Sequence, residues 1–461
     1  MKKLLLLLPF FGLFGCSEQV RQSKSVFMAG EVVNPTDEVV VLLKGEQPLD
    51  TARLDGQNRF EFRLDSVEDG LYVFKHAPEH QYVFLEAGDS LQIRLNTIAF
   101  DESLVFSGKG EEINNFLVEL FLQSEAEEGL IRNSYIRMEP DAFRDRMDSL
   151  KATKLQKLQS WGESVQISDK AFKAAKASIL YHNYLHREMY PFWHRKLTGD
   201  MGLHKLPPDF YAYRQQVSYN DPDLTFLKPY HDFMIYHIGN LAYMGCRKKC
   251  ETRKDQPGNR LHFDQHQLHL IDSLVTGAEL RDNLFRRVAI EYLLKSDSDE
   301  NFDQFMESFH QVAGNNRHLV EIDRLSKAIE DLRPERAVPD LVVESAAGDT
   351  LSLRNIASDG SVVFYFWSGP QQHHLANITR RVQSLQDKYQ AHRFVGICLN
   401  TDRERWKSML KTYQLKESDQ FWTGDFENFA QTLVVFNTYK SILAEDGKIV
   451  DGFANLNTSF E

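Results

Sequence analysis

Residues 362–367 read Val-Val-Phe-Tyr-Phe-Trp, and this run decides the fold of the C-terminal part of the chain. A strand buried on both faces of a sheet has this near-continuous apolar character. A helix is expected over residues 375–389 and a second strand over residues 394–399. This alternation of strand and helix predicts an α/β domain.

Further landmarks flank this run in a consistent order. Short strands are expected over residues 341–343 and 351–353, and a helix over residues 403–413. Asp446-Gly447 is typical of a tight hairpin turn, and strands over 441–444 and 448–450 would flank it.

With these landmarks, residues 336–456 resemble a thioredoxin-like domain of the TlpA (AhpC/TSA) type. The resemblance rests on Val338-Pro339-Asp340, on residues 348–353 and 364–367, and on residues 394–397 and 445–449. It implies a thioredoxin-like fold for the C-terminal domain, over residues 336–461.

The active-site positions depart from that family. Its first cysteine stands four residues after the tryptophan that ends the strand, and its second stands three residues later, which gives Gln371 and His374 here. Thiol–disulfide exchange needs one thiolate to attack and a second thiol to resolve the intermediate. The family also has a cis-proline where this chain has Thr438. These departures predict a redox-inactive domain without the C-x-x-C motif.

The N-terminus is typical of a signal peptide. Met1-Lys2-Lys3 precedes an apolar run over residues 4–14, which is too short to span a bilayer. The run ends in Leu13-Phe14-Gly15-Cys16, which resembles the lipobox of bacterial lipoproteins, although Phe14 is larger than usual. The resemblance implies a signal peptide over residues 1–16, lipid on Cys16, and a tether over residues 17–24. The alternative is an ordinary secretory signal with a chance cysteine.

Residues 25–110 are expected to form an all-β sandwich, because short apolar runs alternate there with turn residues. The stretch resembles the small β-domain of unknown function that precedes thioredoxin-like domains in many envelope lipoproteins. Gly30 and residues 50–52, 56–62 and 84–89 carry this resemblance. It implies no chemistry for these residues.

Residues 111–332 are expected to form an all-α middle domain. Apolar residues recur there at helical spacing, and Ser168 is a favourable N-cap for a helix running toward Met189. The apolar positions that predict the first of these helices most clearly are Phe143, Met147, Leu150, Leu155, Leu158 and Trp161.

Two clusters in the helical region are candidates for chemistry. Cys246 and Cys250 are a possible disulfide or redox pair, although their spacing differs from the usual C-x-x-C. His182 and His186 have the spacing of two metal ligands on one helix face, with Glu188 and His194 nearby. Their aromatic surroundings favour a packing role instead, so the sequence assigns no metal, no cofactor and no catalytic residue. Cys398, in an apolar strand, is expected to be buried.

The formal net charge of −12 argues against nucleic acid as a partner, because phosphate binding needs a basic face. The favoured function is that of a cell-envelope lipoprotein, on the periplasmic side or at the outer membrane. Its degenerate thioredoxin-like domain would be a binding or scaffolding module, with the membrane and a protein as partners. The alternative is a thiol–disulfide oxidoreductase that uses Cys246 and Cys250 or works with an active paralogue. A small-molecule ligand is a third possibility.

Overall fold

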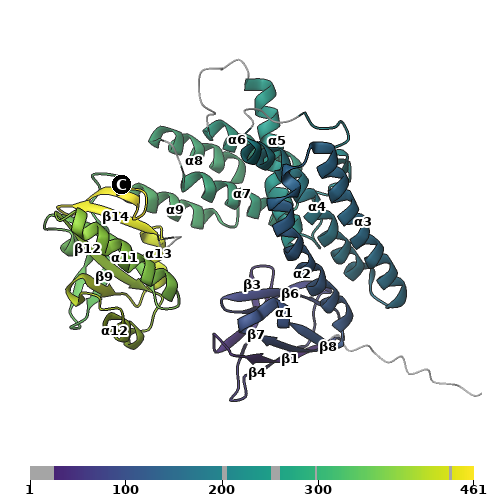
Figure 1. Cartoon of the computed structure of the whole chain (residues 1–461), viewed down its shortest axis with the longest axis horizontal. Helices are drawn as coiled ribbons and strands as arrows, with labels where there is room; N and C mark the ends of the chain where they lie inside the picture. The colour runs from purple at the N-terminus through teal and green to yellow at the C-terminus, as the bar shows by residue number, and fades with distance from the viewer. Residues whose placement is uncertain (1–24, 200–204, 251–259, 296–297, 436–438, 461) are drawn as a thin grey trace, which may run out of the picture. The chain divides into compact units, whose positions relative to one another are not determined.

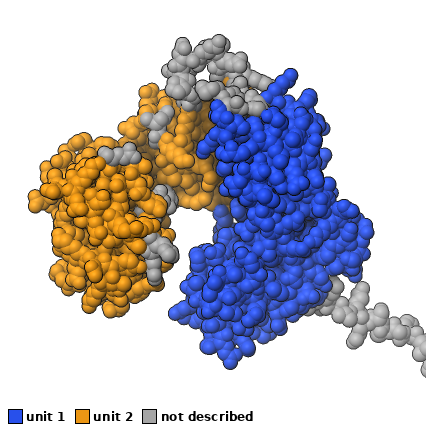
Figure 2. Space-filling view, viewed as in Figure 1, with its two compact units in different colours: residues 1–240 blue, residues 241–461 orange. Residues whose placement is uncertain are grey.

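The computed structural model describes residues 25–199, 205–250, 260–295, 298–435 and 439–460. The chain forms two compact units, Met1–Asn240 and Leu241–Glu461 (Figure 2). Cys16, the expected signal peptide and the tether lie outside the described residues, as does Thr438. Among the helices that are described, none is both long and apolar enough to cross a bilayer.

The first unit begins with two sheets (Figure 1). Within the described residues, one has the strand order β4-β1-β7-β8 and the other the order β3-β2-β5-β6. All neighbouring strands are antiparallel except β1 and β7, which are parallel. The strands are β1 (Val26–Val33), β2 (Val39–Lys44), β3 (Gln47–Arg53), β4 (Arg59–Leu64), β5 (Gly70–His76), β6 (Glu79–Leu85), β7 (Ser90–Asn96) and β8 (Val105–Lys109).

One hydrophobic core contains side chains of both sheets. In β4, Phe60, Phe62 and Leu64 are buried while the intervening charged residues are exposed, so the alternation in the sequence correctly predicts a half-buried strand. Gly30 is required in β1, because a Cβ atom there would lie 2.5 Å from the carbonyl oxygen of Ile93.

Helices occupy the chain from Glu111 to Asp331, as the periodicity predicts. Ser168 caps α4 by accepting a hydrogen bond from the amide of Ala171, and α4 continues beyond Met189 to Thr198. In α3, Phe143, Met147 and Leu158 are buried as expected. The helices described in this region are α2 (Glu111–Asn133), η2 (Tyr135–Arg137), α3 (Pro140–Ser164), α4 (Asp169–Thr198), η3 (Ala212–Gln216), α5 (Lys228–Cys250), α6 (Arg260–Leu274), α7 (Ala278–Leu293), α8 (Asp299–Ala313) and α9 (Leu319–Asp331).

The second unit contains a sheet in which the described strands follow the order β10-β9-β13-β12-β11-β14-β15. Strands β11, β12 and β13 run parallel, and β14 pairs antiparallel with β11. The strands are β9 (Val342–Ser345), β10 (Thr350–Ser352), β11 (Ser361–Ser368), β12 (His392–Leu399), β13 (Gln420–Trp422), β14 (Lys440–Glu445) and β15 (Lys448–Asn455).

The α-helices of the same region are α10 (Leu353–Ile356), α11 (Gln372–Lys388), α12 (Arg403–Thr412) and α13 (Phe426–Thr432) (Figure 1). Residues 362–368 of β11 are all buried, so this strand is central, as its apolar run predicts. The strands and helices expected from the sequence in this region are confirmed. The region has a thioredoxin-like α/β fold.

Candidate functional site

Gln371 and His374, which the sequence resemblance predicts to stand where the family has its two cysteines, lie at the start of α11. Strand β11 ends at Ser368, and Gln371 is the exposed N-cap residue of α11. His374, in the first turn, is partly buried, and its ring packs edge-on against Tyr439, with ring centroids 5.0 Å apart. Both residues thus lie just after the central strand β11, and their assignment as the former thiol positions stays a prediction.

The turn before α11 is held by the loop that follows β12. The amide of Gly369 donates a 2.7 Å hydrogen bond to Oγ1 of Thr401, and Nη2 of Arg405 donates a 3.2 Å bond to the carbonyl of Gly369. These two hydrogen bonds hold the backbone of the turn that leads into α11.

The side chains at this site cannot carry out thiol–disulfide exchange. An amide and an imidazole form no disulfide. Cys398 lies in β12 in register with Trp367 and is fully buried. Burial raises the pKa of its thiol to about 12, so it is not a nucleophile near neutral pH.

Cys246 contacts a histidine from the next helix. Its Sγ lies 3.2 Å from Nδ1 of His266, and the same nitrogen lies 3.2 Å from the carbonyl oxygen of Ala242. A carbonyl only accepts hydrogen bonds, so Nδ1 carries a proton and donates toward both groups. The side chain of Cys250 lies outside the described part, and its pairing with Cys246 stays a prediction.

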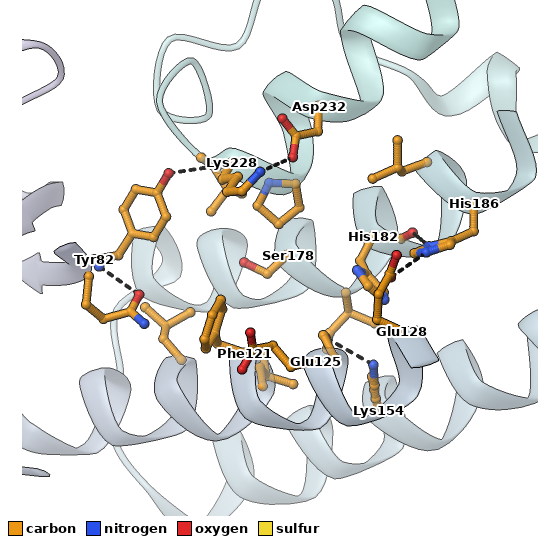
Figure 3. Close-up of a pocket in the computed structure, with 18 of the residues that line it drawn as sticks. Tyr82, Phe121, Glu125, Glu128, Lys154, Ser178, His182, His186, Lys228 and Asp232 are labelled. Atoms are coloured by element: carbon orange, nitrogen blue, oxygen red, sulfur yellow. Dashed lines mark hydrogen bonds and ion pairs between the residues drawn. The ribbon is translucent and has the colours of Figure 1, made fainter. Parts of the chain in front are cut away.

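A pocket of about 450 Å³ opens in the first unit between the ends of β5 and β6 and helices α2 to α5 (Figure 3). Apolar side chains form much of its wall. Glu128, His182 and His186 lie at one end, and Tyr82, Lys228 and Asp232 lie at the other. The apolar lining residues are Leu71, Leu117, Leu120, Phe121, Ile179, Leu185, Leu227 and Pro229.

Glu128 joins α2 to α4 at this end of the pocket. Its Oε2 lies 2.8 Å from Nε2 of His186, and Nδ1 of His186 donates a 2.8 Å bond to the carbonyl of His182. Arg132 binds the other carboxylate oxygen. Burial alone would raise the pKa of Glu128, but His186 and Arg132 together lower it to about 2.

His182 lies beside His186, with ring centroids 4.6 Å apart, as their spacing on one helix face predicts. Burial lowers the pKa of His182 well below its ordinary value, and the electrostatic effects of His186 and Lys154 act in the same direction. The ring is therefore neutral. Its Nε2 is buried and has no hydrogen-bond partner.

The other two residues near this pair in the sequence have separate contacts. Glu188 binds Arg214 and His237, and His194 lies 2.7 Å from the carbonyl oxygen of Ile136 through its Nδ1. The acidic residue that lies beside the two histidines is Glu128, not Glu188. It lies on a different helix, 54 residues before His182, and no local spacing in the sequence points to it.

No protein-family model matches the chain, and no curated protein matches it. Several solved structures are similar to about a quarter of the chain. The thioredoxin domain of a thiol-disulfide oxidoreductase from Bacteroides vulgatus is 16% identical, with a TM-score of 0.25, and the match covers 28% of this chain and 94% of that one. A thiol-disulfide oxidoreductase from Bacteroides fragilis is 23% identical, with a TM-score of 0.21, and the match covers 25% and 88%.

A secreted Mycobacterium tuberculosis disulfide oxidoreductase, homologous to E. coli DsbE, is 18% identical. Its TM-score is 0.21, and the match covers 25% of this chain and 83% of that one. At such scores and identities the matches carry no activity over to this chain. The strand order and the parallel core of the C-terminal sheet support the thioredoxin-like assignment independently.

Proposed function

We propose that this chain is a cell-envelope lipoprotein, anchored through Cys16, whose thioredoxin-like domain binds a protein partner and does not exchange disulfides. One observation carries the proposal. The start of α11 directly follows the central strand β11, where the resemblance implies a thioredoxin-type site, and it carries Gln371 and His374 in place of two thiols. The fold is kept while the reacting atoms are replaced.

The surface at this position is suited to binding. His374 packs against Tyr439, which is 45% exposed, and the ring of Phe453 is 41% exposed beside the ammonium group of Lys440. Exposed aromatic rings are enriched in protein interfaces because each one contributes a large contact area with little loss of side-chain freedom.

Cross-linking in intact envelopes, followed by purification of the full chain, tests this proposal. The same partner should be captured by wild type and by Cys246→Ser/Cys250→Ser, and its yield should fall sharply with His374→Ala/Tyr439→Ala. A partner that is lost with the two cysteines would indicate a mixed disulfide. That result, or capture that does not depend on His374 and Tyr439, would contradict the proposal.

A redox role for Cys246 is the second candidate function. Its contact with His266 favours it, because a neighbouring histidine that becomes protonated lowers the pKa of a thiol. The bond from the same nitrogen to the carbonyl of Ala242 weighs against it, because that bond keeps Nδ1 from accepting the thiol proton. A Cys246–Cys250 pair that dithiothreitol reduces and mild oxidants restore would support this candidate.

A further inference from the structure

Glu128, His182 and His186 bring three ligand types of a transition-metal ion together. One oxygen of the carboxylate and one nitrogen of each ring lie within 4.8 Å of one another. Around a tetrahedral zinc ion, ligand atoms lie about 3.3 Å from each other, given bonds of about 2.0–2.1 Å. Oε2 of Glu128 and Nε2 of His186 are 2.8 Å apart, so small side-chain adjustments would bring the three ligand atoms to that spacing.

The three residues sit on rigid elements. His182 and His186 are one turn apart on α4, and Glu128 is inside α2. The bond from Nδ1 of His186 to the carbonyl of His182 turns Nε2 toward Glu128. Ligating histidines usually have such a bond from the second ring nitrogen, because it fixes the ring orientation and the tautomer. Arg132 orients Glu128 in the same way through its second oxygen.

His182 supplies an independent observation. Its Nε2 is buried and has no hydrogen-bond partner, although buried polar atoms nearly always have one. Leaving such an atom unsatisfied costs free energy, and binding an ion would remove that cost. The ion pair between His186 and Glu128 explains the position of those two residues, but it does not explain His182.

The charges that face the cluster come from several helices. Lys154 of α3 lies near His182, but it is paired with Glu127 at 2.7 Å, so its charge is largely compensated. Arg132 is also paired, with Glu128 itself. Glu125 adds a carboxylate to the pocket wall.

We propose that Glu128, His182 and His186 bind one divalent transition-metal ion, with zinc as the best fit, and that its fourth position opens into the pocket. Two imidazoles and one carboxylate are a common donor set for zinc. Zinc sites with three protein ligands keep one position for water or a small ligand. The pocket of about 450 Å³ provides space for such a ligand (Figure 3).

Zinc titration of the full chain, in detergent, without a histidine tag and against a chromophoric chelator, tests the site. Cys246→Ser/Cys250→Ser should be the common background, because these thiols could bind zinc themselves. One equivalent should bind, and His182→Gln or Glu128→Gln should weaken binding by at least about 10–100-fold, the loss expected even for an outer-sphere change. His310→Gln is the matched control, because His310 is an exposed histidine of α8 whose Nε2 lies 2.7 Å from Asp323 and not in the pocket.

Thermal unfolding with and without zinc separates loss of the site from loss of the fold. Zinc should raise the midpoint of the background chain and of His310→Gln, but not that of His182→Gln. Cobalt should give the intense visible bands of a tetrahedral site in the background chain and in His310→Gln, but not in His182→Gln. Zinc affinity that is unchanged in both His182→Gln and Glu128→Gln would overturn the proposal, as would absence of binding by the background chain.

Discussion

At the scale of single residues, Glu188 organises the helical part of the first unit. Its carboxylate is fully buried and accepts hydrogen bonds from Arg214, Tyr213, His237 and Asn240. Burial alone would raise the pKa of Glu188, but the bonds from His237 and Arg214 lower it. The carboxylate is therefore ionised, and it links α4, η3 and α5.

Glu188→Ala should lower the free energy of unfolding by about 3–5 kcal/mol, because it removes the carboxylate that the half-buried Arg214 and the buried His237 and Asn240 bind. Urea unfolding followed by circular dichroism would measure the loss. Glu38→Ala is the control, because Glu38 forms an exposed ion pair with Arg53 that is worth at most about 1 kcal/mol. Equal losses in the two variants would show that the buried network is not stabilising.

Lys440 gives a prediction of pH dependence. Burial lowers the pKa of its ammonium group to about 7, although the negative charge of Asp451 acts to raise that pKa. In the unfolded chain the ordinary value is 10.5. Between these two pKa values the folded chain holds Lys440 neutral while the unfolded chain binds a proton, so stability rises with pH across this window.

The urea midpoint of wild type should therefore increase from about pH 7 to about pH 9, with a gain of about 2 kcal/mol in the free energy of unfolding. Lys440→Met should lack this gain, because the apolar side chain has no proton to lose. Subtracting the free energy of unfolding of Lys440→Met from that of wild type at each pH removes the contribution of the other titrating groups. If the free energy of unfolding changed with pH in the same way in both chains, the lowered pKa of Lys440 would be contradicted.

The roles of Glu188 and Glu128 could not be predicted from the sequence for the same reason. The spacing of His182, His186 and Glu188 on one helix is visible in the sequence, and the neighbouring histidines are confirmed. Each carboxylate also has a partner from a distant element, because Glu188 of α4 binds Arg214 of η3 and Glu128 of α2 binds His186 of α4. Contacts between distant segments leave no periodic pattern.

At the scale of elements, strands with a clear alternation or a continuous apolar run were predictable, and the edge strand β3 was not. β4 and β11 have buried faces that dictate their sequence patterns. β3 is exposed at nearly every position and pairs only with β2 among the described strands, so no burial constrains its residues. The residues of β3 are typical of turns, so the sequence does not indicate a strand there.

The start of α11 should keep the electrostatics of a thioredoxin-type site. A thiol introduced by Gln371→Cys would stand at the N-cap of a 17-residue helix, where the helix dipole stabilises a thiolate. Its pKa should lie below the ordinary value of about 8.5. The rate of alkylation as a function of pH would measure it, in the Cys246→Ser/Cys250→Ser background.

Ser408→Cys is the matched control for that measurement. Ser408 is exposed in the middle of α12, away from either helix end. Its introduced thiol should titrate near about 8.5. Identical pKa values at the two positions would mean that the end of α11 no longer favours an anion.

At the scale of the whole molecule, the order of the regions was predictable from composition and periodicity. The structure has sheets first, helices in the middle and a thioredoxin-like region last, as expected. The identity of the proposed partner was not predictable, because partners are recognised by surface shape and charge, and many sequences provide equivalent surfaces.

The expected lipid anchor also belongs to this scale. Metabolic labelling with a palmitate analogue should label wild type, and Cys16→Ser should abolish the label, because the lipid is expected on that thiol. Cys398→Ser is the control, since Cys398 is buried and should not be acylated. Labelling that persists in Cys16→Ser would exclude this mode of attachment.

Insulin reduction by the full chain in the presence of dithiothreitol tests the central claim most directly. The thioredoxin-like region lacks thiols at the start of α11, so wild type and Cys246→Ser/Cys250→Ser should both show only the background rate of dithiothreitol alone. A rate clearly above background in wild type that disappears in the double variant would contradict this account and place the activity at Cys246 and Cys250.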